Sequence, residues 1–155
     1  MPTNHYQAWL VQKRKVRFGD TDGAGVMHFH QIFRWAHEAW EESIECYGIS
    51  KEFIFPSASI PKSQCKVFLP IIHCEASFRK PIHVGEELIV KIKPLRINLS
   101  SFQIQTDFNL NNEVMATALI SHTAISPDTR KKCELPNNIH LWLEASSISQ
   151  GPSPV

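Results

Sequence analysis

The feature that most constrains this fold is a stretch over residues 30–47 in which apolar side chains recur with helical spacing. At 100° per residue, polar side chains fall on one line and apolar side chains fall opposite. The apolar arc covers about half the circumference, wider than the ~100° stripe of a helix lying on a surface. We therefore expect this helix to be wrapped by something concave, such as a curled sheet. The arc holds Phe33, Ala36, Trp40, Ile44 and Tyr47, flanked by Ile32, Trp35, Ala39 and Cys46.

Alternating apolar and polar residues predict strands on both sides of this helix. One strand is expected over roughly 6–18, before the helix. A long irregular connection over residues 49–70 follows it, and then strands are expected over 72–79, 88–93, 102–110 and 114–125, with a short helix starting near Pro136. Asn111-Asn112 predicts a two-residue hairpin, because Asn tolerates positive φ. Runs of strands with the helix segregated from them favour an α+β fold.

The length of 155 residues fits one domain, which we place at residues 1–145. Residues 146–155 are rich in Ser and Pro and show no apolar period, so a disordered tail is expected there. The composition, with 43% apolar and 20% charged residues, is that of a globular chain and not of a disordered one.

Charge and hydropathy exclude several classes of partner. The net charge of +1 provides no large field for binding nucleic acid or an anionic membrane. No apolar run approaches the ~20 residues of a membrane span. No signal peptide is visible at the N-terminus, so we expect a cytoplasmic protein. The four cysteines lack any C-x-x-C spacing, which predicts free thiols and no zinc site.

The segment with the strongest chemical signal is residues 18–29, between the first strand and the long helix. It contains three glycines and two carboxylates, Asp20 and Asp22, immediately before the helix. A helix N-terminus presents unpaired N–H groups that can hold an oxyanion. A carboxylate beside such donors suits acyl transfer. The alternative is that Asp20 or Asp22 simply caps a turn or the helix.

Other catalytic motifs are absent or incomplete. No Gly-Lys-Ser/Thr follows the glycines, so the segment is not a phosphate loop, and no Gly-x-Ser-x-Gly elbow exists. His28-x-His30 lacks a third ligand, so we expect no metal site.

The same segment resembles the signature of the 4-hydroxybenzoyl-CoA thioesterase family. The matching residues are VRFGDTDGAGV at 16–26, followed by Phe29 and Arg34-Trp35, with A-x-F-x-x-P at 76–81 downstream. The resemblance implies a hotdog fold, in which an antiparallel sheet wraps a long central helix. Within the family, the residues near His28, His37, Phe55 and His73 look closest to the 1,4-dihydroxy-2-naphthoyl-CoA hydrolase branch of phylloquinone synthesis.

The resemblance also implies roles for individual residues. Asp22 matches the catalytic carboxylate, as nucleophile or general base, and Asp20 matches a structural acid. The backbone N–H of Phe29 matches the donor that polarises the thioester carbonyl. His37 falls where a relative that binds a 4-hydroxybenzoyl ring has an acidic residue, so that substrate is not expected here. Periodicity alone leaves open whether His37 lies in the pocket or is exposed.

Further contacts with a coenzyme A thioester are expected on the helix and after the last strand. Phe33 and Trp40 would contact the acyl group, since aromatic side chains suit a ring or a chain. Arg130, Lys131 and Lys132 form the best local basic cluster for the phosphates, or else a solvated turn. No metal or redox cofactor is required.

Assembly and two rival functions complete the expectations. An exposed sheet edge and helix end favour pairing of protomers, and the resemblance implies a homo-oligomer, either a dimer or a tetramer. One rival function is hydrolysis of fatty acyl-CoA or acyl-carrier-protein thioesters. The other is a non-catalytic acyl-CoA-binding protein, against which the intact Asp22 argues.

Overall fold

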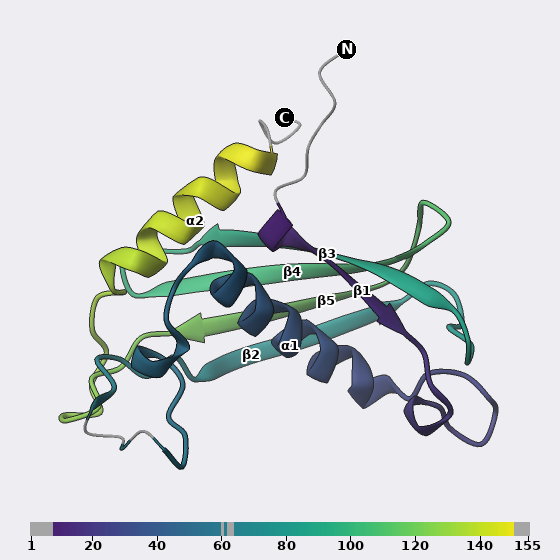
Figure 1. Cartoon of the computed structure of the whole chain (residues 1–155), viewed down its shortest axis with the longest axis horizontal. Helices are drawn as coiled ribbons and strands as arrows, with labels where there is room; N and C mark the ends of the chain where they lie inside the picture. The colour runs from purple at the N-terminus through teal and green to yellow at the C-terminus, as the bar shows by residue number, and fades with distance from the viewer. Residues whose placement is uncertain (1–7, 60, 62–63, 151–155) are drawn as a thin grey trace.

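A curled five-stranded antiparallel sheet packs its concave face against one long helix (Figure 1). The structure is a computed structural model, and it describes residues 8–59, 61 and 64–150. The strand order is β1-β3-β4-β5-β2, which leaves β1 and β2 at the two edges. The main elements are β1 (Val11–Lys15), α1 (Phe29–Tyr47), β2 (Ile71–Phe78), β3 (Glu87–Arg96), β4 (Ser101–Leu110), β5 (Glu113–Thr123) and α2 (Asn137–Gln150). The predicted α+β class and the wrapped helix are confirmed.

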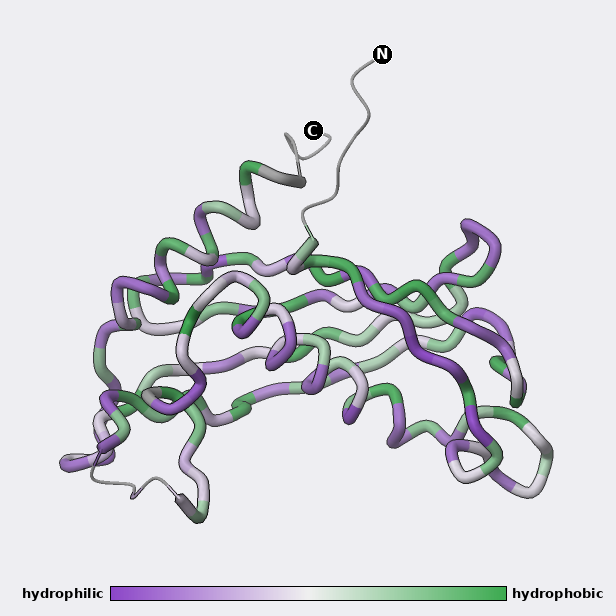
Figure 2. The backbone as a smooth tube through the Cα atoms, viewed as in Figure 1, coloured by the Kyte–Doolittle hydropathy of each residue, from purple (hydrophilic) through white to green (hydrophobic). Residues whose placement is uncertain are grey.

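The core lies between α1 and the inward-facing residues of the three central strands. Along α1 the colour of the tube changes repeatedly between hydrophilic and hydrophobic, as an amphipathic helix requires (Figure 2). The predicted arc is buried at Ile32, Trp35, Ala36, Ala39, Trp40 and Ile44. Two polar residues of α1, Gln31 and Ser43, are also buried. Ser43 is accommodated because its Oγ accepts a hydrogen bond from Trp142 Nε1 on α2, at 3.1 Å.

Both ends of α1 are fixed by local signals in the sequence. At the C-terminus Gly48 has φ +104°, the left-handed conformation that glycine adopts without a Cβ penalty. At the N-terminus the His28 side chain accepts a hydrogen bond from the His30 N–H. The predicted hairpin is confirmed as well, since Asn111 and Asn112 have φ of 50° and 63° between β4 and β5.

The first strand is shorter than the expected 6–18. Residues 6 and 7 lie outside the described residues, Ala8–Leu10 forms a 3-10 turn, and β1 covers only Val11–Lys15. A second 3-10 turn, Phe18–Asp20, ends the extended backbone. Phe18, expected on the core side of a strand, is therefore 85% exposed.

The C-terminal helix is longer than expected, which corrects part of the predicted tail. α2 continues to Gln150, so residues 146–150 are helical. Ser146 is fully buried and its Oγ accepts a hydrogen bond from Trp9 Nε1 at 3.1 Å, which holds the helix against the start of the chain. Residues 151–155 of the predicted tail lie outside the described residues. Among the described helices, none combines the length and apolar character of a membrane span.

The side chains of β2 alternate between the two faces of the sheet as predicted, but those on the concave face are not buried as expected. Cys74, Ala76 and Phe78 lie opposite Ile120, Ala118 and Ala116 of β5, so they point to the concave side. Nevertheless, Cys74 is exposed and Phe78 is 48% exposed. The cause is position, because β2 is an edge strand and the core side of α1 packs mainly against the central strands and η1 (Ala8–Leu10).

Candidate active site

The loop between β1 and α1 folds back on itself as a small hairpin. The Asp22 N–H donates to the Val26 carbonyl at 2.9 Å, and Thr21 pairs with Met27. Gly25 closes the turn with φ +78°, a conformation that most other residues adopt only with strain. The Met27 N–H donates to the carbonyl of Ile82 at 2.7 Å, which attaches the loop to the segment before β3. The loop is thus held from both sides next to the first turn of α1.

Asp20 has a structural environment, as the sequence predicts. Its Oδ2 accepts a hydrogen bond from the Arg17 N–H at 2.8 Å, which closes the 3-10 turn Phe18–Asp20. Its carbonyl accepts from the His28 N–H at 2.8 Å, immediately before α1. Asp20 therefore joins the end of the first strand to the start of the helix.

The side chain of Asp22 is exposed and only half engaged. Its Oδ1 accepts a hydrogen bond from the Ala24 N–H at 2.8 Å. Asp22 therefore does cap the turn, as the alternative interpretation of this residue expects. Its Oδ2 has no hydrogen-bond partner among the described residues. One oxygen thus fixes the orientation of the carboxylate, and the other is available to a water or a substrate carbon.

The first turn of α1 provides a backbone N–H that can donate a hydrogen bond to a carbonyl oxygen during acyl transfer. α1 begins at Phe29, and within the described chain the Phe29 N–H has no backbone acceptor. A free N–H at the positive end of a 19-residue helix is suited to a carbonyl oxygen that gains negative charge. The rings of His28, Phe29 and His30 pack together here, and the Nδ1 atoms of the two histidines are in contact.

A hollow of about 270 Å³ lies against the middle of α1, two turns beyond the helix start. His37 and Trp40 form its α1 wall, and its other walls are mainly aromatic, aliphatic and proline side chains. Those walls comprise Ile54, Phe55, Pro56, Phe68, Leu69, Pro70, Ile125 and Arg130. The structure therefore brings together three of the predicted substrate-binding residues, which are His37, Trp40 and Arg130.

Two histidines lie beside this hollow. His37 is exposed at its rim, and partial burial of the ring lowers the pKa of His37 below its usual value, although Glu41 and Glu38 oppose this. His122 on β5 is fully buried, with its ring 4.3 Å from that of Trp40. Burial lowers the pKa of His122 to about 4, despite a 3.0 Å hydrogen bond between Nδ1 and the Leu69 carbonyl. Its Nε2 has no partner among the described residues.

Sequence reasoning did not identify His122 as a candidate. The signal was present, because His122 continues the inward-facing series Ala116, Ala118 and Ile120 of β5. A histidine at an inward position of a buried strand must place a polar ring in the core.

The remaining predicted residues are more scattered. Arg130 places its guanidinium over the ring of Phe68, with 5.8 Å from Cζ to the ring centroid. Lys131 and Lys132 are exposed and do not line the hollow. Phe33 is partly buried against the core and does not line it either.

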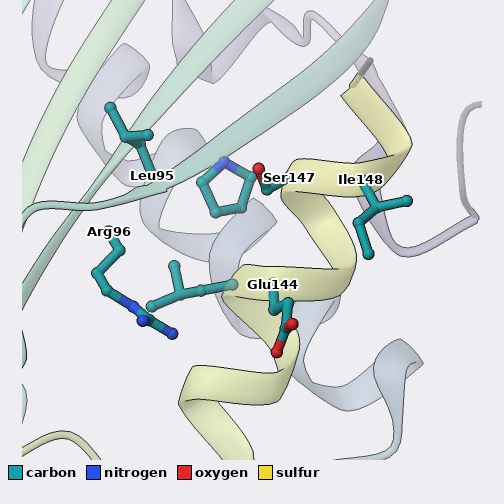
Figure 3. Close-up of a pocket in the computed structure, with 7 residues that line it drawn as sticks. Leu95, Arg96, Glu144, Ser147 and Ile148 are labelled. Atoms are coloured by element: carbon teal, nitrogen blue, oxygen red, sulfur yellow. The ribbon is translucent and has the colours of Figure 1, made fainter. Parts of the chain in front are cut away.

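Two other hollows have more polar walls than the hollow at His37 and Trp40. One of about 330 Å³ has basic walls at Lys13, Arg14, Lys15, Arg17 and Arg34, with Asp20 and Trp35. The other, of about 380 Å³, lies between the end of β3 and α2, where Leu95, Arg96, Glu144, Ser147 and Ile148 surround it (Figure 3). Figure 1 places α2 at the opposite end of the sheet from the Asp22 loop. Among the described residues no three His, Cys, Asp or Glu side chains cluster as metal ligands.

Comparison with known proteins identifies the family. The model of the thioesterase-like superfamily matches residues 16–143. A 1,4-dihydroxy-2-naphthoyl-CoA hydrolase from Prochlorococcus marinus strain MIT 9313 is 51% identical over 142 residues, covering 92% of this chain and 94% of the relative. The enzyme of the same name from another strain of Prochlorococcus marinus, SARG, is 47% identical over 155 residues, with both chains fully covered.

Solved structures agree with these matches. A crystal structure from Prochlorococcus marinus MIT 9313 has a TM-score of 0.84 and 51% identity, covering 93% of this chain and 99% of its own. A 1,4-dihydroxy-2-naphthoyl-CoA thioesterase from Synechocystis has a TM-score of 0.76 and 27% identity, covering 86% of this chain and 94% of its own.

Proposed function

The chain belongs to the thioesterase-like superfamily, and from this premise we propose that it hydrolyses the thioester bond of 1,4-dihydroxy-2-naphthoyl-CoA. It is a thioester hydrolase with a hotdog fold. The substrate is that of relatives 45–52% identical over most of the chain. The single structural observation that supports the reaction is the Asp22 carboxylate, half unbonded, in a loop fixed beside the free N–H at the start of α1.

Asp22 can act by either of two routes. As a general base it would take a proton from a water that attacks the thioester carbonyl carbon. As a nucleophile its oxygen would attack that carbon directly and form a mixed anhydride, which water then hydrolyses. In both routes the carbon–sulfur bond breaks, and the coenzyme A thiolate leaves and takes up a proton.

The Phe29 N–H would hold the carbonyl oxygen during this step. The oxygen becomes negative when the carbonyl carbon turns tetrahedral, so a fixed donor stabilises the transition state more than the ground state. Loss of one such donor typically lowers kcat by about 10²–10³-fold. The hydrogen bonds that fix the loop before Phe29 keep this donor in place before substrate arrives.

The hollow at His37 and Trp40 would receive the acyl ring. A flat bicyclic ring can pack on the apolar walls of this hollow, where the buried Trp40 contributes only the floor, and the imidazole of His37 can exchange a hydrogen bond with a ring hydroxyl. Arg130 at the same hollow would contact the coenzyme A part of the substrate, with Lys131 and Lys132 nearby in the sequence. Fatty acyl-CoA remains the second candidate, since the apolar walls also suit a chain.

We further propose a homo-oligomer that acts in the cytoplasm without metal or redox cofactor. Hotdog thioesterases bind CoA thioesters and typically oligomerise, and the exposed concave side of β2 supports assembly here. All four cysteines are free thiols, which fits a reducing compartment.

The test is a substrate panel with purified protein. Hydrolysis of 1,4-dihydroxy-2-naphthoyl-CoA should exceed hydrolysis of benzoyl-CoA and palmitoyl-CoA in kcat/KM. Equal rates for the naphthoyl and palmitoyl esters would favour the fatty acyl alternative. Binding of the esters without release of free thiol would favour a non-catalytic protein.

A further inference from the structure

Most of the wall of the hollow at His37 and Trp40 comes from chain with little regular structure of its own. Residues 49–70 connect α1 to β2 and supply six residues that line the hollow, between Ile54 and Pro70. Among the described residues of this connection, only short 3-10 turns such as Lys51–Phe53 are regular. A connection of this length keeps one shape only where the rest of the molecule holds it.

Three consecutive carbonyl groups at the end of this connection are held by hydrogen bonds. The carbonyls of Phe68 and Pro70 accept from backbone N–H groups at and just after the end of β5, at 3.0 and 3.2 Å. The carbonyl between them, that of Leu69, accepts from Nδ1 of His122 at 3.0 Å. The outer two anchors use backbone groups that almost any sequence supplies, whereas the middle anchor depends on one side chain.

The direction of the middle hydrogen bond follows from the chemistry of its two groups. A carbonyl oxygen can only accept, so Nδ1 of His122 carries a proton and donates to Leu69. Burial lowers the pKa of His122 to about 4, so the ring is neutral near neutral pH and its Nε2 is unprotonated. His122 therefore holds the Leu69 carbonyl as a neutral donor.

The ring of His122 also contacts the side of the hollow that α1 provides. Its centroid lies 4.3 Å from that of Trp40, which forms the floor of the hollow. It is nearly parallel to the ring of His37, and Phe102 stacks on it with 5.1 Å between centroids. One buried side chain thus packs against Trp40 and holds Leu69, which line the hollow from different elements.

Packing alone does not account for a histidine at this position. The inward-facing residues before it on β5, which are Ala116, Ala118 and Ile120, are all apolar. His122 instead places two ring nitrogens in the core, and its Nε2 has no partner among the described residues. An apolar side chain would avoid this desolvation cost, but it could not donate a hydrogen bond to Leu69.

We propose that His122 is a positioning residue for the acyl group, because it fixes the Leu69 wall of the hollow relative to Trp40. The reacting groups, Asp22 and the Phe29 N–H, do not line this hollow. A flat bicyclic ring cannot change its shape to follow a displaced wall, whereas an acyl chain can. Loss of the anchor should therefore impair use of the naphthoyl ester more than use of the palmitoyl ester. This inference rests on the proposed function, which assigns the acyl group to this hollow.

Two variants of similar shape separate the hydrogen bond of His122 from its packing. Asn and Leu side chains are nearly equal in size and branching, but only the Asn amide can donate to the Leu69 carbonyl. His122→Leu should reduce the preference for 1,4-dihydroxy-2-naphthoyl-CoA over palmitoyl-CoA in kcat/KM by roughly 2- to 10-fold, the range for one lost hydrogen bond, mainly through KM. His122→Asn should recover most of the preference. Equal preferences in the two variants overturn the proposal.

Amide hydrogen exchange tests the wall without any substrate. The N–H groups of residues 68, 123 and 125 form the hydrogen bonds on either side of Leu69. In His122→Leu these amides should exchange roughly 2- to 10-fold faster than in His122→Asn, while the amides of β3 and β4 should differ less. Exchange that accelerates uniformly over the sheet reflects lower overall stability, and it overturns a local role for His122.

A second position on β5 provides the matched control. Ile120→Val shortens an inward-facing side chain that does not line the hollow, so it lowers stability without removing an anchor of the connection. It should change neither the preference between the esters nor the local pattern of exchange, and a change as large as that in His122→Leu overturns the proposal. A chain that does not hydrolyse the naphthoyl ester refutes the proposed substrate, whereas exchange at residues 68, 123 and 125 still decides the role of His122.

Discussion

The rings of His37 and His122 lie nearly parallel, with centroids 6.1 Å apart and planes at 17°. One ring is exposed beside the hollow, and the other is fully buried in the sheet. The charge of His37, when protonated, further lowers the pKa of His122. Because burial favours the neutral form of both rings, this pair should remain uncharged near neutral pH.

The buried histidine makes stability depend on pH in a defined window. In the folded chain the pKa of His122 is about 4, against 6.5 in the unfolded chain, so between these values only the unfolded chain takes up the proton. The free energy of unfolding should therefore fall as pH drops from 6.5 to 4, by roughly 3 kcal/mol. Urea unfolding at several pH values measures this. His122→Gln should flatten the dependence, and an unchanged slope in that variant would contradict it.

Much of the fold could be predicted from the sequence because local signals agree with packing there. The 3.6-residue period of residues 30–47, Gly48 and Asn111-Asn112 each determine one local conformation. The alternation of apolar residues did not distinguish extended backbone from a turn near Phe18. The turn forms because the Asp20 side chain accepts a hydrogen bond from the Arg17 N–H, a contact that the alternation does not reveal. The length of α2 depends on contacts distant in sequence, such as that between Trp9 and Ser146.

The residues of the candidate site also fall into two groups, those that a sequence motif identifies and those that only the fold brings together. Asp22 and Phe29 lie in one continuous segment, so a motif can identify both. The walls of the hollow come from α1, the connection before β2 and the segment after β5, which only the fold brings together. Arg130 illustrates the difference, since sequence places it in a basic run and the structure places it over Phe68.

Asp22→Asn should abolish most of the hydrolysis and leave the fold intact. The amide keeps an oxygen that can accept the hydrogen bond from Ala24 N–H, but it can act neither as base nor as nucleophile. We expect kcat to fall at least ~10²-fold. The matched control, Asp20→Asn, should change the unfolding free energy more than the rate, since Asp20 closes the turn before the loop. Near wild-type turnover in Asp22→Asn would refute the mechanism.

Replacing Arg130, Lys131 and Lys132 by Ala should raise KM for the CoA ester and leave kcat almost unchanged. This is the pattern expected when binding is lost equally from ground and transition states. The control is the pantetheine thioester of the same acid, which lacks the nucleotide and should show no change. If instead KM rises in Lys15→Ala with Arg17→Ala, the phosphates bind in the basic hollow beside β1.

His37→Ala tests whether the rim of the hollow recognises the ring hydroxyls. A site that hydrogen-bonds a hydroxyl leaves its own polar group unpaired when the substrate lacks one, so discrimination depends on that group. We expect His37→Ala to reduce the preference for 1,4-dihydroxy-2-naphthoyl-CoA over 2-naphthoyl-CoA, by roughly 10-fold for one lost hydrogen bond. Hydrolysis of palmitoyl-CoA should change less. Phe33→Ala is the comparison on the same helix, because Phe33 packs against the core outside the hollow and should not alter the preference. An unchanged preference in His37→Ala would show that this imidazole does not contact the ring.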